Sequence, residues 1–316
     1  MSGDAGRAAD VARAFGLGEG ARFTGRLERG EQGQVEELAT ARGAFAVKTS
    51  FGRPELDGED AAFQAAARAA GVPAPAVMRA VGGAWHAEIG GLPVRVYEWV
   101  DVLPPSTAID PAEAGRTVAA IHRTPFAGSR PEDPWYTDPV GARAWDRLLD
   151  GLAAAGAPFG GGLAGLRDEL VAMEGLLERS SHLRTCHRDL WVDNLRRTAA
   201  GGVSVIDWEN CGLADPGEEV AGVVFELGIG DPGRGGEVYR AYRGAGGPGT
   251  VRTRADFSMT IAQLGHILEA ACGIWLDAGT TQEERRRQEG RVAEFVDAPL
   301  TVAVIDELLG EVAGVD

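Results

Sequence analysis

The chain has 316 residues, of which 44% are hydrophobic and 25% are charged, a composition typical of soluble globular proteins. Its net charge of −16 argues against nucleic acid or an anionic membrane surface as a partner. The cysteines Cys186, Cys211 and Cys272 form an odd, sparse set that favours a reducing compartment, and no targeting signal is visible. We therefore predict a cytoplasmic protein.

The front of the chain is predicted to be rich in strands. Residues 5–17 have the pattern of a short amphipathic helix, and the alternating, glycine-broken text from Arg22 to Ser50 is typical of strands joined by turns. The clearest strand is GAFAVKT, residues 43–49, which places Phe45 on one face and Lys48 on the other.

Lys48 is the only lysine in the chain, and every other basic residue is arginine. An ammonium is a compact point charge, whereas a guanidinium is a wide planar fork, so a site that needs the first shape cannot use the second. Alone, this observation leaves a functional lysine and a chance survivor of codon bias equally open.

A helix, a hairpin and a connector follow Lys48. Asp57 can cap a helix that ends at Gly71, before a proline. Residues 85–100 predict a hairpin with its turn near residues 90–93, and the Pro-Pro pair in 102–107 indicates a connector.

The pattern then becomes helical. We expect helices over 111–124 and 165–181, a loop over the glycine-rich stretch 151–166, two short strands around 194–208, and mostly helices from Glu218 onward. The sequence therefore predicts an α+β protein with a β-rich domain over 1–100 and a mainly helical domain over 101–316.

The segment CHRDLWVDN, with VIDWE after it, carries the strongest chemical pattern. His187, Asp189 and Asn194 stand in the spacing H-x-D-x-x-x-x-N, and Asp207 ends an apolar run thirteen residues later. Magnesium-assisted phosphoryl transfer needs a carboxylate for the acceptor hydroxyl, hard oxygen ligands for Mg²⁺ and a cation for the phosphates. Asp189, Asn194 with Asp207, and Lys48 can fill those places.

The same stretches resemble the aminoglycoside phosphotransferase and choline kinase-like family, relatives of the protein kinases. The resemblance covers most of the chain. It rests on the segments FAVKT, YEWV, VAAIHRT, HRDLWVDN, IDWE and ADPGEEVA. It implies a two-lobed protein kinase-like fold, with residues 1–100 as the nucleotide-binding lobe and 101–316 as the catalytic and substrate-binding lobe.

The resemblance also implies roles for individual residues, which agree with those of the kinase catalytic loop. Asp189 would be the catalytic base, Asn194 and Asp207 the magnesium ligands, and Lys48 the contact to the nucleotide phosphates. His187 would brace the loop. Backbone groups near Glu98 and Val100 would hold the adenine. The cofactors implied are Mg²⁺ and ATP, with GTP as the alternative.

Several features depart from the protein kinases. The metal motif is Asp-Trp-Glu, common among the small-molecule enzymes, and no activation segment for a protein substrate is visible. The front loop at residues 26–38 lacks a G-x-G-x-x-G pattern, and Glu219 stands where the family usually has aspartate.

The partner of Lys48 is expected on the helix that follows its strand. Glu59 lies on the apolar face of that helix and is the first candidate, with Asp60 or Glu55 as substitutes. The other interpretation of Glu59 is an acid favoured by the helix dipole alone.

The acceptor is predicted to be a small, cationic molecule with a hydroxyl group, most readily an aminoglycoside-type antibiotic. No basic residue falls between Arg197 and Arg234, and clustered carboxylates there would attract cations. The candidate acceptor-binding residues are Glu209, Asp215, Glu219, Trp275 and Asp277. The alternatives are a solvated acidic surface, a housekeeping kinase for choline, a sugar or a hydroxy amino acid, and a non-catalytic nucleotide-binding protein. The oligomer is left open as monomer or homodimer.

Two weaker motifs are set aside. GGGLAG at 160–165 matches a dinucleotide pattern, but no strand enters it. His182, Cys186 and His187 fit no common zinc spacing.

Overall fold

The computed structural model describes residues 2–29, 33–51 and 57–315, and the chain forms two compact units. We call them the N-terminal unit, made of Met1–Ser106, Thr124–Ser129 and Val192–Cys211, and the helical unit, made of Thr107–Arg123, Arg130–Trp191 and Gly212–Asp316. The predicted division into a domain over 1–100 and a domain over 101–316 stays a prediction.

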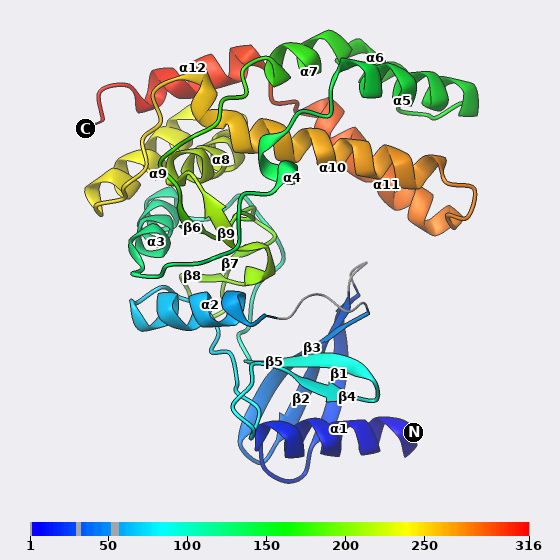
Figure 1. Ribbon diagram of the computed structural model, residues 1–316, viewed down its shortest axis with the longest axis vertical. Helices are drawn as coiled ribbons and strands as arrows, with labels where there is room; N and C mark the ends of the chain where they lie inside the picture. The colour runs from blue at the N-terminus through cyan, green and yellow to red at the C-terminus, as the bar shows by residue number, and fades with distance from the viewer. Residues whose placement is uncertain (1, 30–32, 52–56, 316) are drawn as a thin grey trace. The chain divides into compact units, whose positions relative to one another are not determined.

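The N-terminal unit is built on an antiparallel sheet of five strands in the order β1-β2-β3-β5-β4 (Figure 1). Its elements are α1 (Ser2–Phe15), β1 (Arg22–Arg29), β2 (Gly33–Thr40), β3 (Gly43–Ser50), α2 (Glu59–Ala69), β4 (Ala87–Ile89), β5 (Leu92–Glu98), β7 (Leu195–Arg197), β8 (Val203–Val205) and the 3₁₀ turn η1 (Trp208–Asn210).

Alternation decides which face of the sheet is buried. Phe45 and Val47 of β3 join Val94 and Val96 of β5 in an apolar core that includes Phe15 of α1. The even-numbered residues of β3 point to the opposite face, as expected for a strand, so Lys48 stands on the other side of the sheet from this core.

The short structures around the sheet also follow the sequence. The hairpin turn falls at Gly90 and Gly91, which both have positive φ, as the tight turn between β4 and β5 requires. Asp57 was predicted to cap α2, but the N-cap is Gly58, in the left-handed conformation; Asp57 still accepts from the N–H of Glu59. Gly71, at φ 95°, follows the end of the helix as predicted. On α2, Phe63 packs against Phe126 and, edge to face, against Trp208.

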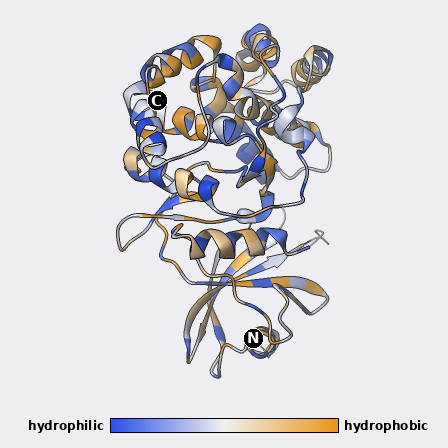
Figure 2. Cartoon of the chain, turned by 60° about the vertical axis from the view of Figure 1, so that its left-hand side comes forward, coloured by the Kyte–Doolittle hydropathy of each residue, from blue (hydrophilic) through white to orange (hydrophobic). Residues whose placement is uncertain are grey.

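The helical unit holds the remaining elements. They are α3 (Pro111–Arg123), α4 (Pro134–Thr137), α5 (Ala142–Ala155), α6 (Gly160–Gly165), α7 (Arg167–Glu174), β6 (Arg184–Cys186), β9 (Gly212–Ala214), α8 (Pro216–Gly228), α9 (Pro232–Gly244), η2 (Arg254–Phe257), α10 (Ser258–Leu276), α11 (Gln282–Asp297) and α12 (Val302–Val312). Hydrophobic residues recur along these helices, as the orange segments of Figure 2 show.

Two predictions for this unit are wrong. The stretch 151–166 is mostly helical, because α5 buries Trp145 and, two turns later, Leu152, while α6 buries Leu163. The helix expected over 165–181 ends at Glu174, whose carboxylate accepts from the indole N–H of Trp145 at 2.8 Å. Burial at a few positions therefore outweighs the poor helix propensity of glycine.

The segment Arg254–Leu276, which contains α10, is the single described helix long and apolar enough to cross a membrane by length and composition. More than half of its apolar window is buried inside the protein, and it packs against α4, α5, α8 and α11. Its apolar surface is thus used as the core of the helical unit.

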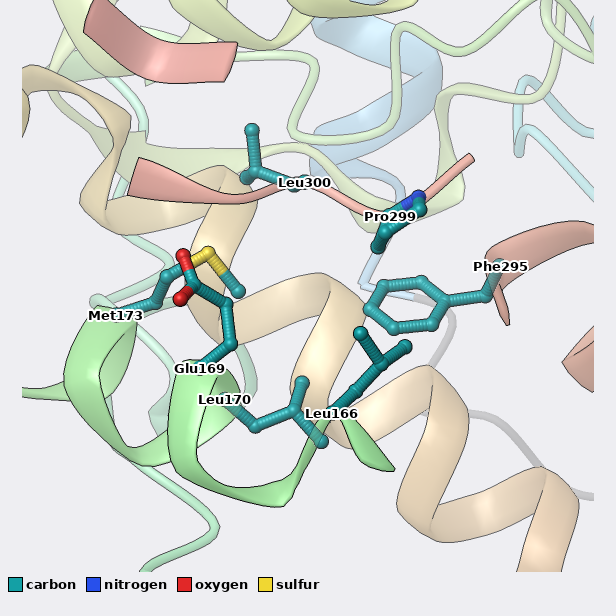
Figure 3. A pocket seen from close by; sticks show the side chains of 7 residues that line it. All are labelled: Leu166, Glu169, Leu170, Met173, Phe295, Pro299 and Leu300. Atoms are coloured by element: carbon teal, nitrogen blue, oxygen red, sulfur yellow. The ribbon is translucent and has the colours of Figure 1, made fainter. Parts of the chain in front are cut away.

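A shallow recess lies in the same unit, between α7 and the end of α11 with the segment that follows it (Figure 3). It is lined by Leu166, Glu169, Leu170, Met173, Phe295, Pro299 and Leu300. Its one carboxylate, Glu169, accepts from the N–H of Val302 at 2.6 Å. The recess is a helix-packing seam whose single carboxylate holds the start of α12.

Candidate active site

Lys48 lies opposite Arg95 in the pairing of β3 with β5, so their side chains share one face of the sheet. Like charges directly opposite each other on neighbouring strands are destabilising. Both side chains are largely buried, with Arg95 only 3% exposed, so this face requires carboxylates for compensation.

Three carboxylates supply that compensation. The Lys48 ammonium lies 2.9 Å from both Asp207 Oδ1 and Glu209 Oε2, and Arg95 forms a two-pronged ion pair with Asp60. Glu209 Oε1 is also 3.8 Å from the Arg95 guanidinium, so Glu209 stands between the two cations. We call these five residues the phosphate-side cluster.

The phosphate-side cluster favours the charged form of the Lys48 ammonium. Burial works against the charge of Lys48, but Asp207 and Glu209 outweigh it and raise the pKa of the ammonium above its ordinary value. Burial, with the negative field of Glu209, raises the pKa of the neighbouring Tyr97 to about 12, so that phenol stays neutral at physiological pH.

The expected pairing of Lys48 with Glu59 is wrong. Glu59 instead accepts from the backbone N–H of Ser129, at 2.8 and 2.9 Å, and from its hydroxyl. Of the two substitutes, Asp60 pairs with Arg95, and Glu55 lies outside the described residues. The pattern on α2 indicated correctly that acids face the protein, but spacing along a helix does not reveal which cation each acid meets.

The hairpin of β7 and β8 brings Asn194 and Asp207 together. Leu195 pairs with Val205, and the N–H of Ile206 donates to the carbonyl of Asn194 at 2.9 Å. Asn194 therefore precedes the hairpin at the same end at which Asp207 leaves it.

Asp207 is one of two non-glycine residues with positive φ among those the structure describes, at 56°. Such a conformation costs of order 1–3 kcal/mol and persists only where the surroundings impose it. An amide and a carboxylate at one hairpin end, with an ammonium 2.9 Å from the carboxylate, offer the hard oxygen donors that suit Mg²⁺ beside phosphates.

The catalytic-loop motif lies in the helical unit as far as Trp191. Its Arg188 is the other non-glycine residue with positive φ among the described residues, at 65°, and comes directly before Asp189. Arg188 and His187 donate their backbone N–H groups to the buried carboxylate of Glu219. A carboxylate of α8 thus holds the backbone of the loop through two hydrogen bonds.

The carbonyl and guanidinium of Arg188 are also held. Gln263 of α10 donates to the carbonyl at 2.8 Å. The guanidinium donates to the carbonyl of Pro131 at 3.0 Å and lies 4.6 Å from the centre of the Tyr136 ring. A Cβ at Gly212 would meet this guanidinium at 2.5 Å, so a residue without a side chain is needed there.

The segment after β5 offers backbone groups where adenine binding was predicted. The N–H of Glu98 donates to the carbonyl of Ala76, and the carbonyl of Val100 accepts from Val102. Within the described residues the N–H of Val100 has no hydrogen-bond acceptor, so it can serve a ligand. The Glu98 side chain accepts from Arg68.

The candidate acceptor-binding residues have other partners. Glu209 belongs to the phosphate-side cluster, and Glu219 lies under the catalytic loop. Trp275 is buried and donates to Glu289, and Asp277 accepts from the N–H of Gly279 after α10.

Asp215 caps α8 by accepting from the N–H of Gly217. The pairing of β6 with β9 sets Ala214 opposite Arg184, so Asp215 lies beside the start of β6, whereas Asp189 follows its end. An acceptor role for these five residues stays a prediction, and the contacts give each of them a structural role.

Sequence reasoning missed two parts of the site. Arg95 was not considered. It lies two residues before Tyr97 on β5 and therefore on the same face of the sheet, and it pairs with Lys48 of β3, which shares that face. The link from His122 to the catalytic loop was also not considered: His122 Nε2 lies 2.6 Å from Glu219 Oε2. The register between β3 and β5 could have revealed the first, but nothing local to α3 could have revealed the second.

Comparison with known proteins covers almost the whole chain. A family model described as "Phosphotransferase enzyme family" matches residues 26–256. No curated protein matches the sequence significantly. An aminoglycoside phosphotransferase structure from Alicyclobacillus acidocaldarius is 18% identical, with 92% of each chain covered and a TM-score of 0.60.

Two further structures are similar. A spectinomycin phosphotransferase in complex with ADP and spectinomycin has a TM-score of 0.66 at 13% identity, with 96% of this chain and 98% of that chain covered. A microcompartment-associated aminopropanol kinase has a TM-score of 0.59 at 15% identity, with 99% of this chain and 100% of that chain covered. These likenesses confirm the predicted two-lobed kinase-like α+β fold class.

Proposed function

Because the chain belongs to the phosphotransferase enzyme family, we propose that it transfers the γ-phosphoryl group of ATP to a hydroxyl of a small cationic molecule. The predicted family and the predicted enzyme class, a small-molecule kinase with an alcohol acceptor, are confirmed. The observation that carries the residue-level proposal is the phosphate-side cluster, in which the sole lysine lies 2.9 Å from Asp207 Oδ1.

In this proposal Lys48 binds the nucleotide phosphates, and Asn194 and Asp207 bind Mg²⁺. The metal, when bound, neutralises charge that develops on the transferring group. Glu209 keeps the ammonium charged, and the Arg95 guanidinium, which Asp60 of α2 pairs, lies 3.8 Å from Glu209. Glu59 lies outside this arrangement, and its proposed part is to anchor α2 through Ser129.

Asp189 is proposed as the base that orients the acceptor hydroxyl and takes its proton. It stands five residues before Asn194, so the backbone between them spans at most ~18 Å. The contacts of Arg188 at three points fix the backbone immediately before Asp189. His187 is proposed to brace the same loop.

The nucleotide is proposed to hydrogen-bond through its adenine to the backbone near Glu98 and Val100. The N–H of Val100, which has no acceptor among the described residues, supports this assignment. ATP is the first choice over GTP, and the similar spectinomycin enzyme is in complex with ADP.

An aminoglycoside-type antibiotic is the first acceptor, which would make this a cytoplasmic resistance enzyme. The net charge of −16 and the likeness to a spectinomycin phosphotransferase support a cationic acceptor. A metabolic kinase for an amino alcohol is the second candidate, because the aminopropanol kinase is similar over its full length. A small molecule is the only partner proposed, bound by a monomer or homodimer.

The test measures ADP formation with Mg-ATP and Mg-GTP against aminocyclitols, aminoglycosides, macrolides, choline, ethanolamine, aminopropanol, sugars and hydroxy amino acids. We expect turnover with one cationic class and none without divalent ion. Nucleotide binding without turnover for any acceptor would favour a non-catalytic protein. Turnover with sugars alone would contradict the cationic acceptor.

A further inference from the structure

A buried polar chain runs from α9 through α3 to the catalytic loop, all within the helical unit. The N–H of Gly249 donates to the hydroxyl of Tyr242 at 2.8 Å, and that hydroxyl lies 2.8 Å from His122 Nδ1. His122 Nε2 lies 2.6 Å from Glu219 Oε2, and Glu219 accepts from the N–H groups of His187 and Arg188.

Every link of this chain is hydrogen-bonded. With the His122 proton on Nε2, each hydrogen bond has one donor and one acceptor: Tyr242 donates to Nδ1, and Nε2–H donates to Glu219. His122 is 1% exposed and Glu219 is 2% exposed. A buried carboxylate needs such donors, because without them its desolvation costs several kcal/mol.

The hydrogen-bonded chain ends at Arg188, the residue of the catalytic loop with a strained backbone. A positive φ persists only where surrounding contacts impose it. At Arg188, directly before Asp189, the hydrogen bond from its N–H to Glu219 is such a contact. Burial would raise the pKa of the Glu219 carboxyl, but the hydrogen bonds from His122 and from the N–H of Arg188 lower it, so the acceptor stays ionised.

A metal at this place is a weaker explanation. His122, Cys186 and Glu219 lie close enough to hold an ion. However, Glu219 already accepts from two amides, and the Cys186 thiol lies 3.6 Å from the carbonyl of Ala214. The donors and acceptors match one another without a cation.

We propose that His122 and Tyr242 are positioning residues for phosphoryl transfer: through Glu219 they hold Arg188 in its strained conformation and so aim Asp189 at the acceptor. The proposal rests on the proposed function for its catalytic consequence. It adds residues that neither the catalytic-loop motif nor the nucleotide site contains.

Tyr239 of α9 provides a matched control for Tyr242. Tyr239 lies one turn from Tyr242 on α9, is equally buried, and its hydroxyl accepts from the N–H of Val251 at 2.9 Å. Tyr239 does not hydrogen-bond His122. Tyr239→Phe therefore removes the same chemical group and a comparable backbone contact without touching the chain to Glu219.

We compare Tyr242→Phe, His122→Gln and Tyr239→Phe with the unchanged protein in steady-state kinetics and nucleotide binding. Misplacement of a reacting group by about 1 Å can lower a rate by ~100-fold, so we expect Tyr242→Phe and His122→Gln to lower kcat by about 10- to 100-fold. We expect the Kd for ATP and the acceptor KM to change less than about threefold, and Tyr239→Phe to keep kcat.

Hydrogen exchange of the His187 and Arg188 amides gives a readout independent of activity. Faster exchange in Tyr242→Phe and His122→Gln but not in Tyr239→Phe supports the proposal, even if the acceptor assignment fails. Equal exchange in all three variants, or a kcat of Tyr242→Phe no lower than that of Tyr239→Phe, overturns it. If His122→Gln fails to fold, the two tyrosine variants decide.

Discussion

Replacing Asp60 with asparagine tests the electrostatic explanation of the phosphate-side cluster. Asp60 and Arg95 are 2% and 3% exposed, and their side chains form a two-pronged ion pair. Removing one charge from a buried pair costs about 3–5 kcal/mol, because the partner charge stays desolvated. Glu209 Oε1 remains 3.8 Å from the guanidinium, so we expect the lower end, about 3 kcal/mol.

The assay is urea unfolding of Asp60→Asn beside a control, Asp10→Asn. Asp10 pairs with Arg13 on α1 in the same unit, but the two side chains are 53% and 76% exposed. An exposed pair contributes about 0.5 kcal/mol or less, so the control should unfold nearly as the unchanged protein does. If Asp60→Asn lost no more stability than Asp10→Asn, the claim that Arg95 needs a buried partner would be wrong.

Three further predictions concern single side chains. Lys48→Ala should raise the KM for ATP and lower kcat in the ADP assay, and unchanged values would remove Lys48 from the site. Burial and the nearby Asp215 raise the pKa of Glu218 from 4.5 to about 8, so the folded protein binds a proton that the unfolded chain releases. The protonated, neutral Glu218 is compatible with burial, so its contribution to the free energy of unfolding is complete below pH 4.5 and is lost as the pH rises through 8. Glu218→Gln should match the unchanged protein in denaturant midpoint at pH 4 and exceed it at pH 9, and equal midpoints at both would contradict the shift. Gly212→Ala should displace the Arg188 guanidinium and lower kcat by ~10-fold, whereas the same change at exposed Gly161 should not.

Much of the fold could be predicted because local rules govern it. Alternation in β3 placed Lys48 opposite the core face, and the paired glycines predicted the turn after β4. The glycine-rich α6 could not be predicted, because burial of Leu163 by the surrounding helices outweighs local propensity.

The site follows the same division. The spacing of Asn194 and Asp207 around two short strands indicated a shared location, and the β7–β8 hairpin provides it. The partner of Lys48 was assigned to the wrong acid, because a salt bridge between residues 159 positions apart depends on how distant segments fold together. The contact of Glu209 with the Lys48 ammonium could not be predicted for the same reason, and its acceptor role stays a prediction.

The most direct test of the account is the turnover of Asp189→Asn with the best acceptor, measured beside its Kd for ATP. General-base catalysis contributes about 10²- to 10⁴-fold, so we predict a loss of that size in kcat with little change in ATP affinity. Near-normal turnover in this variant would contradict it, because a neutral amide cannot take the acceptor's proton.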